Sequence, residues 1–297
     1  MGSQSINDGF FRALFPGQAT SEKLSHIEER ALEKVKQLLE GQHQPNTIPR
    51  LPAVIPRLMR SLRDPSSNAT DYVSIINKDP AMSAAVLKLA NTVYFSPAHK
   101  RITAIDTAVV KLGIEGLRSV LSAAVMQPVI QKDSPYFHHF GEQLWQHSLQ
   151  CAVACERIAQ LRGAEPFMAY LLGLIHEIGT ITAFGELCRE LKDTTSEPPG
   201  FDVFTPFLQA HAARLSEEIA RQWELPDALC DALHQQVNIR SGDEVSIYGH
   251  TLYQANLICE VMTASEFHPP KAVNKLLRAL ELPETLYLEL KSLSVEV

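Results

Sequence analysis

The stretch Phe-Met-Ala-Tyr-Leu-Leu-Gly-Leu-Ile at residues 167–175 is the most apolar part of the chain, and His176 and Glu177 follow it at once. It is about half as long as the ~18 apolar residues that a membrane-spanning helix needs. That length suits a helix buried in a protein core, and Gly179 offers a stop at its carboxyl end. We therefore expect a core helix here, with a polar pair at its end.

Apolar residues recur at helical spacing along almost the whole chain. Between Ile27 and Leu39 they occupy positions 27, 31, 35, 38 and 39 among Glu and Lys residues, which is typical of an amphipathic helix. Strand-like alternation is essentially missing. The sequence therefore predicts an all-α fold, a compact multi-helix arrangement with two helical lobes. We expect helices near residues 27–39, 53–63, 70–78, 81–92, 105–112, 114–130, 137–161, 166–178, 181–193, 204–223, 226–239, 246–265, 270–281 and 284–292.

Turn-rich stretches suggest where the chain divides. Three prolines lie between residues 45 and 52, and residues 131–135 are polar and rich in turn formers. We expect an N-terminal helical segment over residues 1–44 and a main domain over 45–260. The main domain would have lobes at about 45–133 and 136–260, and residues 261–297 would form C-terminal helices packed on the second lobe.

The charge is distributed unevenly. The net charge of the chain is −7, with a balance of +4 over residues 1–135 and −11 over residues 136–297. An acidic chain is a poor electrostatic match for nucleic acid, so we do not expect a nucleic-acid partner. The uneven balance is explained either by two lobes with different surfaces or by chance on two solvated faces.

The cysteines indicate the compartment. The chain has five, and none forms a Cys-x-x-Cys pair. An odd number without that spacing favours buried thiols over disulfides or a cysteine zinc site. With no apolar run of membrane-spanning length, we expect a cytoplasmic protein with no membrane partner.

Four histidines within apolar helical stretches are the candidates for chemistry: His147, His176, His211 and His234. A buried imidazole must find a polar partner, and a shared divalent ion would satisfy several of them at once. Imidazole with carboxylate oxygen suits zinc, iron or manganese, so His176-Glu177 is the strongest pair. The alternative is that these histidines are hydrogen-bonded core residues that join helices, with no metal at all.

Five elements of the sequence resemble the signature of the HDOD family, in order and at sensible spacing over roughly residues 45–260. They are Leu51–Pro56, Asn77–Ser83, Leu87–Phe95, Ile102–Val109 with Leu112-Gly113, and the Trp-Glu-Leu-Pro tetrapeptide at 223–226. The resemblance implies a compact all-α domain related to the HD and HD-GYP metal-dependent phosphohydrolases. It also implies a role in bacterial signalling, in a family many of whose members have lost hydrolase residues.

The HD metal pattern can be carried over by position. His147 and His176 match the first histidine and the histidine of the His-Asp dyad, but Glu177 stands where aspartate is usual. His211 and His234 match the later histidines, and Asn256 occupies the final aspartate position. No Gly-Tyr-Pro tripeptide of the HD-GYP enzymes is present. This set carries a charge of −1, far less than two divalent ions at about +4 require, so at most one ion is expected.

We therefore expect a non-catalytic signal-transduction module that acts by binding a signalling protein or a small nucleotide. Arg57, Arg60 and Arg63 lie at helical spacing and could contact such a partner, although a solvated helix face has the same pattern. The alternative function is a metal-dependent phosphohydrolase. In that case His147, His176, Glu177 and His211 would hold the ion, and His234 would ligate or transfer protons.

Overall fold

The computed structural model describes residues 3–14, 26–39, 48–61, 68–96, 101–130, 138–191, 201–237, 244–264 and 270–294. These residues form fourteen helices and contain no strand, which confirms the all-α prediction. The helices are α1 (Ser3–Leu14), α2 (His26–Leu39), α3 (Val54–Ser61), α4 (Ala69–Asn77), α5 (Pro80–Ala90), α6 (Ile105–Ile130), α7 (His138–Arg162), α8 (Pro166–Ile175), α9 (Ile178–Leu191), α10 (Phe201–Gln222), α11 (Asp227–Val237), α12 (Ile247–Thr263), α13 (Pro270–Ala279) and α14 (Glu284–Ser294).

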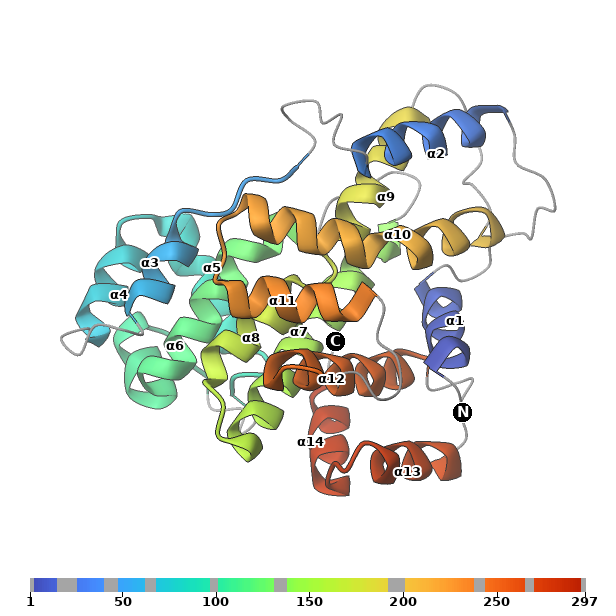
Figure 1. Ribbon diagram of the computed structural model, residues 1–297. Helices are drawn as coiled ribbons and strands as arrows, with labels where there is room; N and C mark the ends of the chain where they lie inside the picture. The colour runs from blue at the N-terminus through green and yellow to red at the C-terminus, as the bar shows by residue number, and fades with distance from the viewer. Residues whose placement is uncertain are drawn as a thin grey trace.

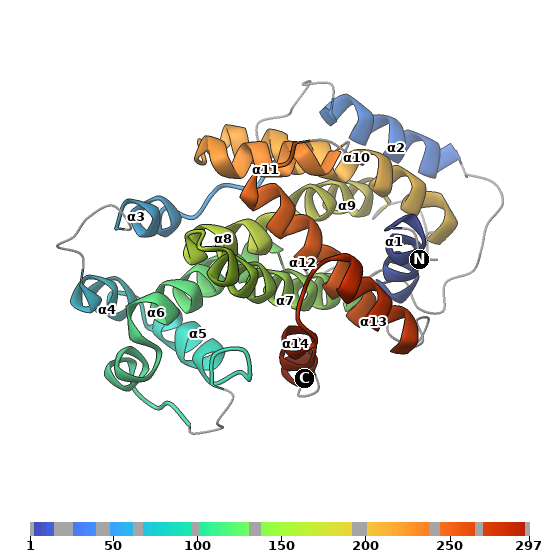
Figure 2. The same cartoon turned by 60° about the horizontal axis from the view of Figure 1, so that its bottom comes forward.

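The helices are arranged around a central pair, α7 and α8. Helices α3–α6 gather at one end of the molecule and α1 lies at the other (Figure 1). The view in Figure 2 shows α2, α9, α10 and α11 along one side of that pair, with α12 crossing it. Helix α12 packs on α7, and α1 packs on α12. The division into a leading segment, two lobes and C-terminal helices stays a prediction.

Helix boundaries follow local chemistry at several points. The side chain of Asp79 accepts a hydrogen bond from the amide of Ala81, and Pro80 begins α5, as expected for an N-terminal cap followed by proline. Asn68 caps α4 in the same way and forms a reciprocal capping box with Asp71. Gly113 has φ +66°, so α6 turns where the sequence predicted two helices.

One helix, α1, was not among those predicted. Its apolar residues Ile6, Phe10, Phe11 and Leu14 are all nearly fully buried. They recur four, five and eight residues after the first, a helical pattern that the sequence analysis passed over within residues 1–44. Because α1 packs on α12, two of its residues, Asn7 and Phe11, face the same cavity as residues of α12.

The apolar stretch at 167–175 is part of the core. Residues 166–187 are long and apolar enough to cross a membrane by length and composition, but 89% of that window is buried inside the protein. His176 and Glu177 also interrupt it between α8 and α9. Cys151, Cys155, Cys230 and Cys259 are free and buried, as predicted, while the side chain of Cys188 lies outside the described residues.

A carboxyl group joins α6 to α7. The hydroxyl of Ser119 on α6 donates to Oε1 of Glu156 on α7 over 3.3 Å. Burial raises the pKa of Glu156 to about 6 from 4.5, against the opposing effects of Arg157 and Ser119. The folded protein therefore holds this proton more tightly than the unfolded chain does.

This carboxyl should make stability depend on pH. A raised folded-state pKa contributes stability that is fully present below pH 4.5 and is lost as the pH rises through 6. We expect about 2 kcal/mol of unfolding free energy to disappear over that interval, and Glu156→Gln to remove this dependence. Urea denaturation at pH 4.5, 5.5 and 6.5 measures it, with the exposed Glu142→Gln on the same helix as control. Parallel pH curves for wild type and Glu156→Gln would contradict the prediction.

Candidate functional site

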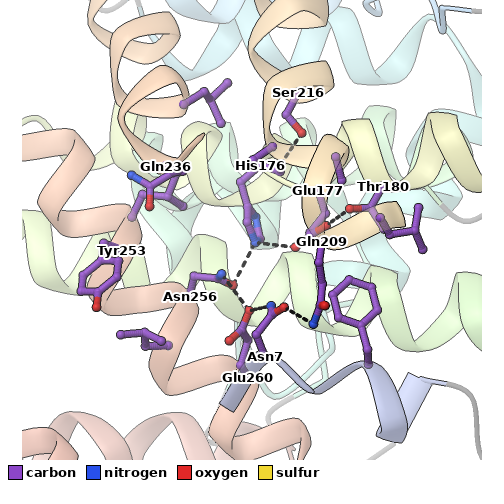
Figure 3. A pocket seen from close by; sticks show the side chains of 17 residues that line it. Asn7, His176, Glu177, Thr180, Gln209, Ser216, Gln236, Tyr253, Asn256 and Glu260 are labelled. Carbon is purple, nitrogen blue, oxygen red and sulfur yellow. Dashed lines mark hydrogen bonds and ion pairs between the residues drawn. The ribbon is translucent and has the colours of Figure 1, made fainter. Parts of the chain in front are cut away.

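A cavity of about 260 Å³ lies where α1, α10 and α12 meet the junction of α8 and α9. Figure 3 shows the polar side chains that face it. They include Asn7 of α1, His176 and Glu177 of the junction, Gln209 of α10, and Asn256 and Glu260 of α12. The cavity therefore brings together residues that are up to 253 positions apart in sequence.

The junction is held by its own backbone contacts. His176 and Glu177 form the turn between α8 and α9, and Nδ1 of His176 donates to the carbonyl oxygen of Gly173 over 2.7 Å. The hydroxyl of Ser216 on α10 donates to the carbonyl oxygen of His176 over 2.6 Å. In the neutral ring this arrangement leaves the lone pair on Nε2, the atom that faces the cavity.

His147 reaches the same place from α7. Its Nε2 lies 3.0 Å from Oδ1 of Asn256, and its ring centroid lies 4.4 Å from that of Phe10 and 5.3 Å from that of His176. Burial holds the pKa of His147 well below its usual range; the nearby His176 acts in the same direction, and the hydrogen bond to Asn256 opposes them. The neutral ring therefore donates its Nε2 proton to Asn256.

Asn256 links both histidines to a buried acid. Its Oδ1 lies 3.2 Å from Nε2 of His176, while its Nδ2 donates to Oε1 of Glu260 over 3.1 Å. Burial raises the pKa of Glu260 to about 8, although hydrogen bonds from Asn7 and Asn256 oppose this shift and Glu177 adds to it. At neutral pH Glu260 is therefore largely protonated and contributes little negative charge to the site.

One divalent ion fits the donor set. Ligand atoms of His147, His176 and Glu177 all lie within 4.8 Å of one another. Ligands at ~2.1 Å from a common ion can be at most ~4.2 Å apart, so a small inward shift would complete a three-residue site. Nε2 of His176 is 3.5 Å from Oε1 of Glu177. With Glu177 as the single carboxyl group in this set, the residues do not fit a pair of ions.

Two of the expected metal ligands lie elsewhere. His211 on α10 is partly exposed and packs on the ring of Phe207, with centroids 4.7 Å apart. His234 on α11 is exposed, and its Nδ1 donates to Oε2 of Glu217 over 2.9 Å. The structure therefore brings His147, His176, Glu177 and Asn256 together and leaves His211 and His234 outside the cavity.

The expected partner-binding arginines are on α3. Arg57 and Arg60 are exposed there, at the far end of the molecule from α1, and Arg63 lies outside the described residues. Their role in binding a partner stays a prediction. Conversely, Asn7, Gln209 and Glu260 face the cavity, although the sequence analysis did not select them.

The comparison with known families agrees with this geometry. The chain is an all-α protein in which His176 faces a cavity. The HDOD domain family matches residues 48–239, and the chain belongs to that family. Helices α1 and α2 precede the matched segment, and α12 with Asn256 and Glu260 follows it.

One curated relative is an uncharacterized protein of Treponema pallidum (strain Nichols). It is 25% identical over 204 residues, which cover 66% of this chain and 39% of the relative. The chain therefore spans about two-fifths of that protein's length, and the activity of the whole relative does not transfer directly.

Solved structures share the fold. An HDOD domain protein of unknown function from Geobacter sulfurreducens matches with a TM-score of 0.61 and 21% identity, covering 90% of this chain and 99% of its own. A Shewanella amazonensis SB2B protein named "Putative metal-dependent phosphohydrolase" matches at 0.64 and 17%, covering 91% and 99%. A Marinobacter aquaeolei VT8 protein named "Putative signal transduction protein" matches at 0.53 and 18%, covering 98% and 63%.

Gly173 allows α8 to lie close against α7, and a larger residue at this position tests how closely the two helices are held. A methyl group there would lie 2.6 Å from the carbonyl oxygen of Cys151 and 2.7 Å from Cα of Ala152, both backbone atoms of α7. We expect Gly173→Ala to lower the free energy of unfolding by about 1–3 kcal/mol, because α8 must move away from α7. Chemical denaturation measures the loss. Unchanged stability would mean that the two helices are not held at this distance.

Proposed function

We propose that the chain is a regulatory module that acts by binding a ligand in this cavity, without phosphoester hydrolysis. The observation that supports this most directly is the position of Asn256. Its neutral carboxamide lies against Nε2 of both histidines, at 3.0 and 3.2 Å, where the resemblance to HD enzymes would have an aspartate. The carboxamide oxygen accepts the Nε2 proton of His147 and also lies beside the Nε2 lone pair of His176.

The charge around the cavity supports the same conclusion. A two-metal hydrolase must balance about +4 and hold a hydroxide between the ions. Here Glu177 is the one carboxylate of the candidate ligand set, and the raised pKa of Glu260 keeps that group largely neutral. Ligand binding would instead change how α1, α10 and α12 pack, because each of these helices contributes to the cavity wall.

Metal analysis and a hydrolysis assay test the proposal together. The protein is purified without chelator, bound metal is measured by elemental analysis, and p-nitrophenyl phosphate and bis-p-nitrophenyl phosphate are offered with added Mn²⁺ or Fe²⁺. We expect no turnover above that of the His176→Ala variant. Stoichiometric metal with turnover that disappears in His176→Ala would overturn the proposal.

A metal-dependent phosphohydrolase is the second candidate, and the convergence of acceptor atoms favours it. Nε2 of His176 carries a lone pair in the neutral ring, and it faces Oδ1 of Asn256 and Oε1 of Glu177. A cation would relieve the repulsion among these atoms. Held by His147, His176 and Glu177, it would act as a Lewis acid on a phosphoryl oxygen and lower the pKa of a water ligand.

Restoring a carboxylate separates the two candidates. If missing negative charge is what weakens metal binding, Asn256→Asp should bind Mn²⁺ at least about tenfold more tightly than wild type, because an ionised oxygen replaces a neutral one. Isothermal titration calorimetry measures the difference, with His147→Ala in the same background as control. If wild type binds Mn²⁺ as tightly as Asn256→Asp, the charge argument is wrong and the hydrolase becomes the better proposal.

A further inference from the structure

The wall of the cavity contains no lysine or arginine among the residues that the structure describes. Seventeen residues line the cavity. None of them is Lys or Arg, and two of them, Glu177 and Glu260, carry a carboxyl group. A phosphate group in such a site would meet the carboxyl group of Glu177 and no lysine or arginine to balance its charge. The electrostatics therefore favour an uncharged ligand over an anionic one.

The side-chain amide of Asn7 lies in the polar part of the cavity wall, where two other side chains bind it. Nε2 of Gln209 donates to Oδ1 of Asn7 over 2.8 Å, and Nδ2 of Asn7 donates to Oε1 of Glu260 over 2.8 Å. The carbonyl and the amino side of the Asn7 carboxamide are thus each recognised by a separate residue. Figure 3 shows these residues side by side with Asn256.

Asp8 determines which way round the side-chain amides of Gln209 and Asn7 lie. Nε2 of Gln209 also donates to Oδ1 of Asp8 over 2.9 Å, and an ionised carboxylate can only accept. The amino group of Gln209 must therefore point towards α1, so Asn7 presents its carbonyl to Gln209 and its amino group to Glu260. A reversed amide would put two donors or two acceptors together.

The helix that carries Asn7 lies outside the segment that matches the HDOD family. Helix α1 ends at Leu14, well before the matched segment that begins at residue 48. Its attachment comes from Ile6, Phe10 and Leu14, which are almost completely buried. Asn7 is one polar residue among these apolar contacts, so its side chain can be exchanged while the helix stays docked.

We infer that Gln209 and Glu260 form a subsite for the amide group of a small uncharged ligand, and that Asn7 occupies it as an internal stand-in. The ligand displaces the Asn7 side chain and fills the adjoining space of about 260 Å³, whose wall includes the rings of Phe11 and Tyr253. The ligand class is a planar ring that bears a carboxamide. The inference deepens the proposed function and rests on it, because it assumes that the cavity binds without hydrolysis.

Nicotinamide is the probe, since it is an uncharged ring with a primary carboxamide, and nicotinate is its anionic counterpart of the same shape. Asn7→Ala removes the internal amide and keeps a good helix former. We expect this variant to bind nicotinamide at least about tenfold more tightly than wild type, measured by calorimetry, and not to bind nicotinate. Adding Gln209→Ala should abolish the gain, and the exposed Ser5→Ala on the same helix should leave the affinity at the wild-type value.

Two safeguards keep the test decisive. Asn7→Ser serves if Asn7→Ala does not fold, and in the wild type nicotinamide must shift the NMR resonances of the Asn7 side-chain amide. Equal affinity of wild type and Asn7→Ala, binding of nicotinate as tight as that of nicotinamide, or unmoved Asn7 resonances at saturating nicotinamide would each overturn the inference. Metal-dependent turnover in the separate phosphoester assay would overturn the proposed function, whatever the result with nicotinamide.

Discussion

The contact of one carboxamide with two imidazole rings determines much of this structure. Asn256 on α12 meets His147 on α7 and His176 at the end of α8 through a single oxygen atom. Three segments far apart in sequence thereby meet at a buried point. The hydrogen bond between Nε2 of His147 and Asn256 avoids the cost of leaving these two atoms unpaired, about 1–3 kcal/mol. His147 is held by this bond and His176 by its bond to the carbonyl oxygen of Gly173, so the presence of the two histidines does not by itself indicate catalysis.

The same contact explains why the site differs in character from that of a two-metal hydrolase. Catalysis with two ions depends on several ionised oxygens around them. Here a carboxamide takes one position, and Glu260 is kept largely protonated by burial. What remains is a cavity that offers hydrogen-bond donors and acceptors with little net charge, and the proposal of ligand binding rests on this property.

The sequence was sufficient for the helical class and for most helix boundaries, because breakers such as Asp79-Pro80 act locally. Four of the candidate residues selected from it meet at one place in the structure: His147, His176, Glu177 and Asn256. It was not sufficient for the burial of Glu260, which depends on how α12 meets α1. His147 and His211 both lie in apolar helical stretches of the sequence, yet His147 is buried and His211 is partly exposed. Helical periodicity indicates which residues share a face, but not which helix that face meets.

The close approach at Gly173 has a mechanical consequence. With no side chain between them, α7 and α8 are in backbone contact, and densely packed elements of this kind resist deformation. This rigid pair of helices holds His147, on α7, and His176, at the end of α8. A change in the volume of the cavity must therefore come from the other helices that line it, among them α1, which contributes Asn7 and Phe11.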